Sequence, residues 1–548
     1  MGIYLNPGPR RFSQALNSEI YVDKTEMISY LNRVVNTEQR FVCVSRPRRF
    51  GKIIAANMLA AYYGRGDSRG LFQDRKIAEL NDWDRYLNGF DVIRLVMTKF
   101  IKSKTTIEES LSKIQRSIVR EIKKEYPDIE YMDEADLVQT MDDLYNESGK
   151  QFVVIIDEWD AAFREKKMDE EGQREYLDFL RDWLKDQEYV ALAYMTGILP
   201  IKKFGKHSAL NMFSEFSIMY PMQLAPSTGF TEDEVRALCV EYGRDFNRIM
   251  EWYDGYKVNG IVPPDPGYEV QNRTGIEKEQ KEYFVCNPLS VVEAVSTGII
   301  QNYWNRTETY DALSDYISID FDGMKEAIAL LMDGGRVKVN TGTYQNDMTS
   351  FRSRDDVLTM LIHLGYLGYD SDAKEAFVPN REILDEFRNS TGSGEWADVF
   401  ESFRKSEELL RATWSQNEEK VAEILEWFHD TAENKTYNSE AALSYAVQMA
   451  YYAGQKYYTA IQELDSGKGY ADLVYLPSPK SSGKPALLIE LKYGKTRQTA
   501  ADQIRKRNYP QKLTHYKGSL LLISINYDKE VSSAGASYKR HSCKIEKA

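Results

Sequence analysis

The segment at residues 45–52, SRPRRFGK, combines residue types that can bind a phosphate group. It joins an apolar run to a helical pattern, so its Gly51-Lys52 pair falls at the start of a helix. Backbone N–H groups at a helix start attract anions, and a lysine there can reach the outer phosphates of a nucleotide. A basic turn that only caps a helix is the alternative. We expect this segment to bind a phosphate-bearing cofactor through Gly51 and Lys52, together with the arginines Arg46, Arg48 and Arg49.

Two carboxylates about a hundred residues later have the chemistry to complete such a site. Asp157 and Glu158 follow the apolar run 152–156. Asp157 would organise Mg²⁺ and Glu158 would polarise an attacking water. The next apolar run ends at Thr196, whose side chain could sense the terminal phosphate of the nucleotide. Carboxylates that merely end a strand are the alternative, but suitable groups at three strand ends in the right order favour a nucleotide site.

Two positions depart from the common phosphate-loop pattern GxxxxGK[ST]. Arg46 stands at the first glycine, and Ile53 stands where a serine or threonine normally ligates Mg²⁺. Because isoleucine cannot ligate a metal, we expect this departure to affect hydrolysis of a nucleotide more than its binding.

A separate set of residues could cut a phosphodiester bond. Asp472 lies at the start of one predicted strand, and Glu490 and Lys492 lie two residues apart on the next strand, so both point to one face. Two carboxylates suit Mg²⁺ or Mn²⁺, which lowers the pKa of a bound water. Lys492 would position that water or offset the charge of the phosphate. A salt-bridged edge of a sheet is the alternative.

The elements that must position these residues follow distinct patterns along the chain. Residues 40–225 alternate short apolar runs with helical patterns, which predicts a doubly wound α/β domain with a parallel sheet. The expected strands are 41–44, 92–96, 152–156 and 190–194, and the expected helices are 52–63, 107–125 and 171–186. Beyond these we expect a helix after Thr231, a strand pair at 364–369 and 376–378, charged helices over 396–430 and a mixed α/β unit over 437–530.

Taken together, the motifs resemble a known family. The loop at 45–52, the Ile-Asp-Glu-Trp-Asp segment at 156–160 and the segment 196–199 are similar to AAA-ATPase-like proteins found fused to a PD-(D/E)xK nuclease in bacteria. Further signatures are matched by WYDGY at 252–256, CNPLS at 286–290 and Tyr303-Trp304. The resemblance covers about residues 5–310 and implies an ATP-binding P-loop domain. It identifies no certain arginine finger, for which the candidates by position are Lys202, Lys203 and Lys206.

The Asp…Glu-x-Lys segment resembles the PD-(D/E)xK nuclease core over about residues 437–530. This resemblance implies a metal bound by Asp472 and Glu490, with Lys492 beside it. It further implies that Glu440, on a preceding helix, completes the site, with Glu463 as the second choice. On the helix after the Glu-x-Lys strand it implies a catalytic role for Gln503 and nucleic-acid binding by Arg505, Lys506 and Arg507.

We therefore expect four parts in the chain. Residues 1–230 would form an AAA-ATPase-like P-loop domain, and residues 231–395 a helical lid with a small winged-helix-like region. Residues 396–436 would form a helical connector, and residues 437–548 a PD-(D/E)xK nuclease-like domain of mixed α/β structure.

The net charge of the 548 residues, −13, divides unevenly between these parts. Residues 437–548 contain 17 Lys and Arg against nine Asp and Glu, whereas the rest of the chain contains 54 against 75. The predicted nuclease part is therefore basic, at +8, and the rest is acidic, at −21. A basic surface is what attraction to a phosphate backbone requires.

Other classes of site and location find less support. The four cysteines form no CxxC pair and the five histidines show no metal-ligand spacing, which argues against a disulfide framework, a zinc site or a histidine-dependent hydrolase. No apolar run is long enough to cross a bilayer, and the first residues lack the apolar core of a signal peptide. We expect a cytoplasmic protein without a membrane partner, and assembly into a homo-oligomer stays open.

Our leading hypothesis is an ATP-binding protein, impaired in hydrolysis, that gates a Mg²⁺-dependent nuclease. The alternative is a nucleotide-dependent switch or scaffold that binds nucleic acid without cleaving it. The residues do not distinguish DNA from RNA as the target.

Overall fold

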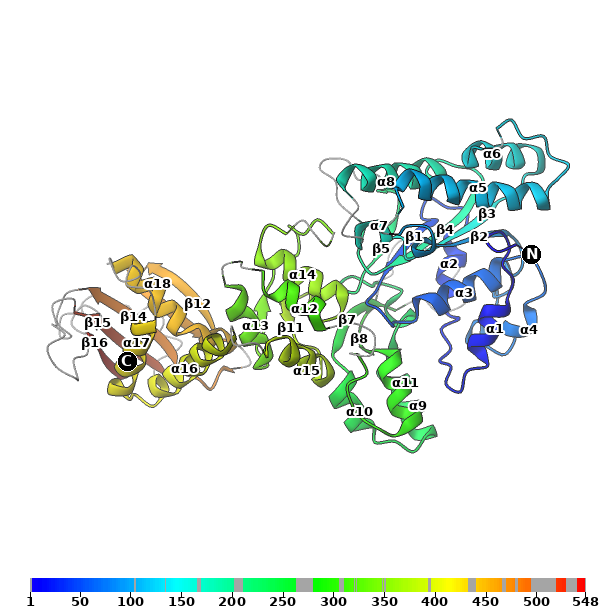
Figure 1. Ribbon diagram of the computed structural model, residues 1–548. Helices are drawn as coiled ribbons and strands as arrows, with labels where there is room; N and C mark the ends of the chain where they lie inside the picture. The colour runs from blue at the N-terminus through cyan, green and yellow to red at the C-terminus, as the bar shows by residue number, and fades with distance from the viewer. Residues whose placement is uncertain are drawn as a thin grey trace. The chain divides into compact units, whose positions relative to one another are not determined.

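The computed structural model forms two compact units (Figure 1). The N-terminal unit comprises Met1–Tyr316 with Lys338–Phe387, and the C-terminal unit comprises Ile317–Val337 with Arg388–Ala548. The structure describes residues 2–547 except 103–104, 134, 165–168, 202–209, 263–278, 305–309, 320, 322, 347, 349–350, 393–395, 432–439, 466–469, 479–480, 494–518 and 529–539.

A five-stranded parallel sheet forms the centre of the N-terminal unit. Its strands follow the order β2-β3-β4-β1-β5, and every neighbouring pair is parallel. All residues of β1, β3 and β4 are buried, which explains their nearly continuous apolar sequence. The predicted parallel sheet is thus confirmed, with strands β1 (Phe41–Ser45), β2 (Asp91–Val96), β3 (Phe152–Asp157), β4 (Val190–Gly197) and the unpredicted β5 (Ser214–Phe216).

Helices cover both faces of this sheet, as Figure 1 shows. Val154 and Ile156 of β3 join one core, whereas Val153 and Ile155 join the other. The first core is closed by α5 (Ile107–Glu125), α6 (Leu137–Ser148) and α8 (Glu170–Leu184), and the second by α1 (Arg10–Leu16), α2 (Met27–Val34) and α3 (Lys52–Tyr63). The predicted bounds of α3 and α5 are confirmed. Helix α5 begins at Ile107 because Thr106 and Glu109 exchange backbone and side-chain hydrogen bonds as a capping box. Two short helices, α4 (Arg69–Phe72) and α7 (Ala161–Arg164), lie in the connections.

Helices and small sheets follow the parallel sheet. Three helices pack around Val235, Ile249 and Val291, namely α9 (Glu232–Glu241), α10 (Phe246–Tyr253) and α11 (Pro288–Thr297). Beside them runs a small sheet of β6 (Phe230–Thr231), β8 (Gln280–Cys286) and β7 (Tyr256–Ile261). Helix α9 starts after Thr231, as predicted. The predicted strand pair is confirmed as the antiparallel β10 (Gly368–Asp370) and β11 (Glu375–Phe377), which share a sheet with β9 (Val337–Lys338). The remaining helices are α12 (Tyr310–Ile317), α13 (Met324–Met332), α14 (Arg354–Leu364) and α15 (Arg381–Ser390).

The C-terminal unit contains a five-stranded mixed sheet, which confirms the predicted mixed α/β fold. Strands β14 and β15 are parallel, and the other neighbouring pairs are antiparallel. In order across the sheet the strands are β12 (Tyr458–Asp465), β13 (Tyr470–Pro477), β14 (Ala486–Tyr493), β15 (Leu520–Tyr527) and β16 (His541–Lys547).

Three helices share a core with one face of the mixed sheet: α16 (Ala397–Trp414), α17 (Glu418–Thr431) and α18 (Glu440–Ala450). Leu409 and Leu425 of these helices lie in the same hydrophobic cluster as Ile489 of the sheet. The helices predicted as a connector thus contribute to the core of the C-terminal unit. Within the described residues, no helix is long and apolar enough to cross a membrane.

The WYDGY segment connects α10 to β7 through only two residues, Asp254 and Gly255. Gly255 has a φ of +124°, and a Cβ at this position would collide with the carbonyl oxygen of Pro379. Tyr253 and Tyr256 on either side donate their hydroxyl groups to the carbonyls of Gln301 and Gly365. The motif therefore lets distant segments of the N-terminal unit approach closely.

We expect Gly255→Ala to destabilise the N-terminal unit by about 3 kcal/mol or more, because it combines a strained backbone with a collision. The control is Gly243→Ala, at a φ of +63° with open space around it, which should lose only about 1–2 kcal/mol. Urea unfolding of the two variants measures the difference, and equal losses would contradict the prediction.

Candidate functional site

The predicted phosphate-binding loop is a turn between β1 and α3. Gly51 caps the helix with a left-handed φ of +84°, and Arg49 also has a positive φ, of +68°. The ammonium group of Lys52 donates to the carbonyls of Arg46 at 2.9 Å and Pro47 at 2.7 Å. Burial lowers the pKa of Lys52 to about 8, against the opposing attraction of Asp160 and Asp157. The loop therefore holds a partly desolvated cation at the start of a helix.

A cavity of about 920 Å³ opens at this loop. Its size is that of a site for a small organic ligand or cofactor. The charged and polar side chains of its lining include Arg48, Arg49, Lys52, Thr98, Asp157, Glu158 and Arg164. Apolar side chains also line it, among them Ile20, Val22, Met58, Phe230, Leu289 and Val292. This combination suits a ligand with an anionic portion and a flat apolar portion, as a nucleotide has.

Asp157 ends β3 and faces this cavity. Neither of its carboxylate oxygens accepts a hydrogen bond within the described structure, although both are buried, and the nearest cation is Arg94 at 3.8 Å. Burial raises the pKa of Asp157 to about 6, while Arg94 acts in the opposite direction. A buried carboxylate with unused lone pairs fits a divalent cation, so the residues present suit a nucleotide accompanied by Mg²⁺.

Glu158 follows with a left-handed φ of +53°. Its carboxylate accepts a hydrogen bond from the hydroxyl of Thr98, just after β2, and lies 4.0 Å from the guanidinium of Arg164. A non-glycine residue in this conformation is strained, and such strain is held in place by its partners. Neither Thr98 nor Arg164 was predicted as a site residue. For Thr98 a signal was present, because it is a polar residue just after a predicted strand.

Asp160 organises the end of β4. Its carboxylate accepts from the N–H groups of Ile198 at 3.0 Å and Leu199 at 2.9 Å. Gly197 is needed there, because a Cβ would lie 2.8 Å from both Asp160 and Trp159. The backbone of this strand end is thereby fixed at the edge of the cavity.

Two predicted cofactor residues do not line the cavity. The guanidinium of Arg46 is buried and donates to the carbonyls of Ser45, Phe216 and Leu224. The hydroxyl of Thr196 donates to the carbonyl of Val44 at 3.0 Å. The structure thus brings together Arg48, Arg49, Gly51, Lys52, Asp157 and Glu158, and it places Arg46 and Thr196 in the scaffold beneath them.

Ile53 lines the cavity with 56% of its surface exposed, as does its neighbour Ile54 with 45%. An apolar side chain therefore occupies the place where a hydroxyl is common. The lysines predicted as finger candidates, Lys202, Lys203 and Lys206, lie outside the described residues.

The CNPLS and Tyr-Trp motifs meet at a buried carboxylate. Glu382 of α15 accepts from the hydroxyl of Ser290, at 2.9 and 3.1 Å, and from the N–H groups of Tyr303 and Trp304. Burial raises the pKa of Glu382 to about 7. We call the hydrogen bonds of Glu382 with Ser290, Tyr303 and Trp304 the Glu382 latch. Because Leu289, next to Ser290, lines the cavity, this latch connects the cavity wall to α15.

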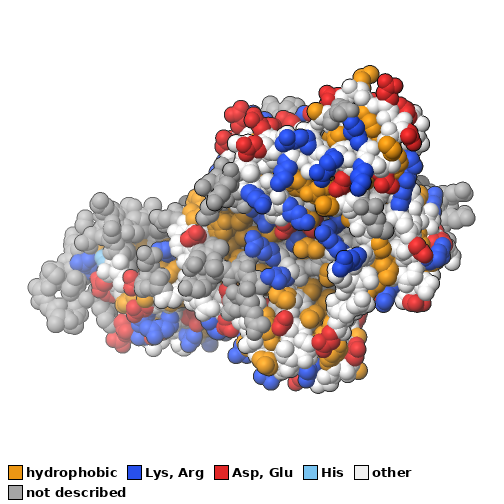
Figure 2. Space-filling view, turned by 45° about the vertical axis from the view of Figure 1, so that its right-hand side comes forward, with side chains coloured by type: hydrophobic (Ala, Val, Ile, Leu, Met, Phe, Trp, Pro, Cys, Tyr) orange, Lys and Arg blue, Asp and Glu red, His pale blue; other side chains and the backbone are white. Residues whose placement is uncertain are grey.

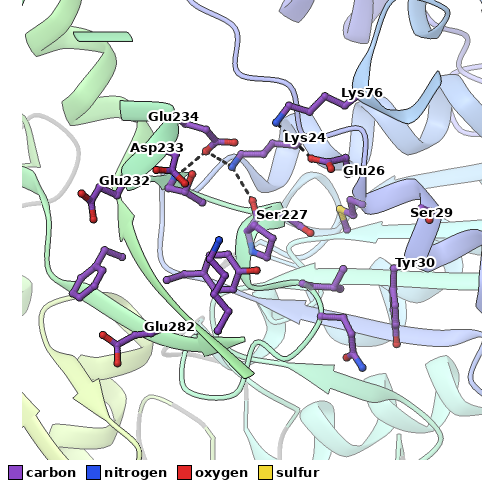
Figure 3. A pocket seen from close by; sticks show the side chains of 18 of the residues that line it. Lys24, Glu26, Ser29, Tyr30, Lys76, Ser227, Glu232, Asp233, Glu234 and Glu282 are labelled. Atoms are coloured by element: carbon purple, nitrogen blue, oxygen red, sulfur yellow. Dashed lines mark hydrogen bonds and ion pairs between the residues drawn. The ribbon is translucent and has the colours of Figure 1, made fainter. Parts of the chain in front are cut away.

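A second cavity, of about 500 Å³, adjoins the first and shares Lys24 and Ser227 with it (Figure 3). Lys24 donates to Glu234 at 2.5 Å and to the carbonyl of Pro226 at 2.7 Å. Glu234 also accepts from the N–H of Thr231 at 2.8 Å. These contacts tie the N-terminal segment to the first turn of α9.

Glu490 and Lys492 of the predicted nuclease site form an ion pair on β14. The ammonium lies 3.1 Å from the carboxylate, and both side chains are buried, with 1% and 8% exposure. On the same strand Leu487, Ile489 and Leu491 join the core under the helices, so Glu490 and Lys492 belong to the opposite face. A buried charged pair away from the helical core is unusual for a purely structural sheet.

The register places further polar residues beside this pair. Leu473 pairs with Ile489, so the next position along each strand sets Asp472 opposite Glu490. On the other side Ser524 and Asn526 of β15 pair with Glu490 and Lys492, and neither was foreseen from the sequence. Glu440 begins α18.

Several other predicted residues of this site lie partly or wholly outside the described part of the chain. The backbones of Asp472 and Glu440 are described but their side chains are not, and the same holds for Glu463. Gln503, Arg505, Lys506 and Arg507 lie outside the described residues. Among the side chains that are described, no group of three His, Cys, Asp or Glu is placed to hold a metal.

Two regions of the chain match known family models. Residues 9–206 match the model of a family described as predicted AAA-ATPase, and residues 443–534 match that of the PD-(D/E)XK nuclease superfamily. The chain thus carries an AAA-ATPase-like domain followed by a PD-(D/E)XK nuclease superfamily domain. No curated protein matches the sequence significantly.

Solved structures similar to the chain include a Walker-type ATPase, a Cdc6p protein and an ORC2 protein. A Walker-type ATPase of Pyrococcus abyssi is 12% identical, with 67% of this chain and 94% of that chain covered and a TM-score of 0.35. The Cdc6p protein of Pyrobaculum aerophilum is 10% identical (68% and 96% covered, TM-score 0.26), and the ORC2 protein of Aeropyrum pernix is 12% identical (68% and 96%, TM-score 0.29).

The Glu382 latch makes a pH-dependent contribution to stability. Its pKa of about 7 in the folded state lies above the ordinary 4.5, so its contribution is fully present below about pH 4.5 and is lost as the pH rises through 7. We expect the stability of the native protein relative to Glu382→Gln to fall by about 3 kcal/mol between pH 4.5 and pH 8. Unfolding of both proteins across this range measures it. The control is the exposed Glu251→Gln, and a pH-independent difference would contradict the prediction.

Proposed function

We propose that the chain is an ATP-binding protein, impaired in hydrolysis, that controls a Mg²⁺-dependent nuclease in its C-terminal unit. The observation that carries the first half is the cavity shared by Lys52, Asp157 and Glu158. The second half is supported by the buried Glu490–Lys492 pair inside the region that matches the nuclease superfamily.

In the N-terminal unit the chain's own groups would divide the work of nucleotide binding. Lys52 and the N–H groups at the start of α3 would contact the outer phosphates. Asp157 would hold Mg²⁺, which when bound neutralises phosphate charge. The apolar walls from residues 20–22 and α11 would enclose the base. Of the groups named, Glu158 is the one suited to orient a water at the terminal phosphate.

In the C-terminal unit Asp472 and Glu490 would hold Mg²⁺, with Glu440 completing its environment. The bound ion supplies a Lewis acid and lowers the pKa of a water. Lys492 would orient a water for attack on phosphorus, where a new P–O bond would form as the bond to the leaving oxygen breaks. Gln503 and the basic residues Arg505, Lys506 and Arg507 would hold the nucleic acid.

The basis for control is the latch between α11 and α15. Helix α11 contributes Leu289 and Val292 to the cavity wall, and Ser290 holds Glu382 on α15. Helix α15 runs from residues of one unit into residues of the other, since the division falls between Phe387 and Arg388. A change in the cavity wall would therefore act on the segment that leads to the nuclease.

Charge supports nucleic acid as the partner of this protein. The region of the nuclease match lies in the part of the chain with net charge +8. The sign of the surface charge also varies within the N-terminal unit. In Figure 2, Lys and Arg side chains gather across the middle of the visible face, and Asp and Glu side chains gather toward its upper edge. Overall acidity therefore does not argue against a phosphate-bearing partner.

We expect Glu490→Gln to reduce Mg²⁺-dependent cleavage of DNA or RNA by about 100-fold or more, because it removes a metal-ligating charge. Glu423→Gln, which removes the same charge from an exposed position on α17, is the control and should retain activity. Cleavage of labelled single- and double-stranded substrates with and without Mg²⁺ is the measurement. Undiminished cleavage by Glu490→Gln would overturn the nuclease assignment.

We expect Ile53→Ser to raise ATP turnover by about tenfold or more, since the hydroxyl supplies the ligand that Mg²⁺ normally finds at this position. Ile54→Ser places the same hydroxyl one residue later on the same cavity wall and should have no such effect. Phosphate release at saturating ATP measures both. A native chain that already turns over ATP as fast as the Ile53→Ser variant would show that our interpretation of Ile53 is wrong.

The alternative function, a nucleotide-dependent switch that binds nucleic acid without cutting it, rests on Ile53. A site that binds but does not hydrolyse ATP suits a switch. Binding of labelled nucleic acid by the native chain without Mg²⁺-dependent cleavage would favour this alternative.

A further inference from the structure

Arg164 is a cation that lines the proposed nucleotide cavity. It belongs neither to the loop motif at 45–52 nor to the Asp157-Glu158 pair. It ends the short helix α7, seven residues after Asp157, and its side chain lines the cavity with 14% exposure. Its guanidinium lies 3.4 Å from the carboxylate of Asp160 and 4.0 Å from that of Glu158. It also acts on the pKa of Lys52, which it lowers. Arg164 therefore belongs to the same electrostatic site as the phosphate-binding lysine.

The guanidinium has unused hydrogen-bonding capacity. Its Nε and Nη2 atoms are buried, yet within the described structure neither donates a hydrogen bond. A buried donor without an acceptor is costly, and more so when it is charged. By contrast, the buried guanidinium of Arg46 is used by three backbone carbonyls.

The neighbouring carboxylates accept hydrogen bonds from other donors. Oδ2 of Asp160 accepts the N–H groups of Ile198 and Leu199, whereas its buried Oδ1 has no hydrogen-bond partner within the described structure, and Glu158 accepts the hydroxyl of Thr98. Both are held close to Arg164 without hydrogen bonds to it, so they set its position and leave its donors for a ligand. Arginine presents these donors as a planar fork that matches the oxygens of a phosphate.

We propose that Arg164 binds the terminal phosphate of the nucleotide and so makes the site select a triphosphate over a diphosphate. This inference rests on the proposed nucleotide site. Glu158 is placed to orient a water at the terminal phosphate, and Arg164 lies beside Glu158. A triphosphate that enters the cavity is repelled by the negative charges of Asp157, Glu158 and Asp160. The positive charge of Arg164 offsets this repulsion at the position of the outermost phosphate. A diphosphate has no group at that point.

The test compares two affinities in the full-length protein. Calorimetry with a non-hydrolysable ATP analogue and with ADP, both with Mg²⁺, gives the two dissociation constants. We expect Arg164→Gln to weaken binding of the triphosphate about 10- to 100-fold, the scale of a charged hydrogen-bonded contact, and binding of ADP less than about threefold. Arg181→Gln removes the same charge from an exposed ion pair on α8 and should change neither constant.

A purely structural role for Arg164 predicts a different result, namely equal weakening of both nucleotides together with a lower unfolding temperature. That outcome, or no change in either constant, would overturn the inference. Should Arg164→Gln unfold, Arg164→Lys decides, because it keeps the charge but loses the fork. Arg164→Lys should weaken binding of the triphosphate but not of ADP, and by less than Arg164→Gln does. A native chain that binds both nucleotides equally overturns the inference but not the nucleotide site, and one that binds neither overturns both.

Discussion

The parallel pairing of β1, β3 and β4 is the constraint on which the nucleotide cavity depends. Thr196 on β4 pairs with Val44 on β1 and with Asp157 on β3, so the three strands end at one edge of the sheet. The chain leaving β1 turns there into α3, and the chain leaving β3 turns there into α7. Lys52, Asp157, Glu158 and Arg164 come from segments about a hundred residues apart, and they meet because parallel strands present their carboxyl ends on the same side.

Burial then gives these groups their chemistry. It raises the pKa of Asp157 to about 6 and lowers that of Lys52 to about 8, so each is shifted toward its neutral form. A phosphate would favour the charged lysine, and a cation would favour the charged carboxylate. The electrostatic arrangement is therefore completed by a ligand that brings both charges. The Glu490–Lys492 pair in the other unit is likewise buried, and its two opposite charges lie 3.1 Å apart on one strand.

The segments beyond the parallel sheet close the cavity and connect it to the rest of the chain. Helix α11 is started by Asn287, whose side chain accepts from the N–H of Leu289 at 2.9 Å, with Pro288 at the first helical position. That cap aims Leu289 and Val292 into the cavity while Ser290 turns to Glu382. Within five residues the CNPLS motif thus caps α11, lines the cavity and binds Glu382. These combined roles account for its recognisable sequence.

The sequence by itself predicted the parallel and mixed sheets and several of the residues that line the cavity. Continuous apolar runs indicated strands buried on both faces, and the Gly51-Lys52 pair and the Asp157-Glu158 pair are recognisable because their chemistry depends on neighbours in the chain. The Glu-x-Lys spacing likewise placed Glu490 and Lys492 on one face. The short strand β5 was missed, because its sequence Ser-Glu-Phe contains no apolar run.

Only the tertiary structure decided which way individual side chains turn and which distant groups meet. Arg46 turns to the carbonyl of Phe216, 170 residues away, and Thr196 turns to β1, although both stand at strand ends where a ligand contact was expected. Thr98 and Arg164 meet Glu158 across separate segments. A side chain at a strand end has several polar partners within reach, and the choice among them depends on burial and on hydrogen bonds to residues remote in the sequence, which no local pattern encodes.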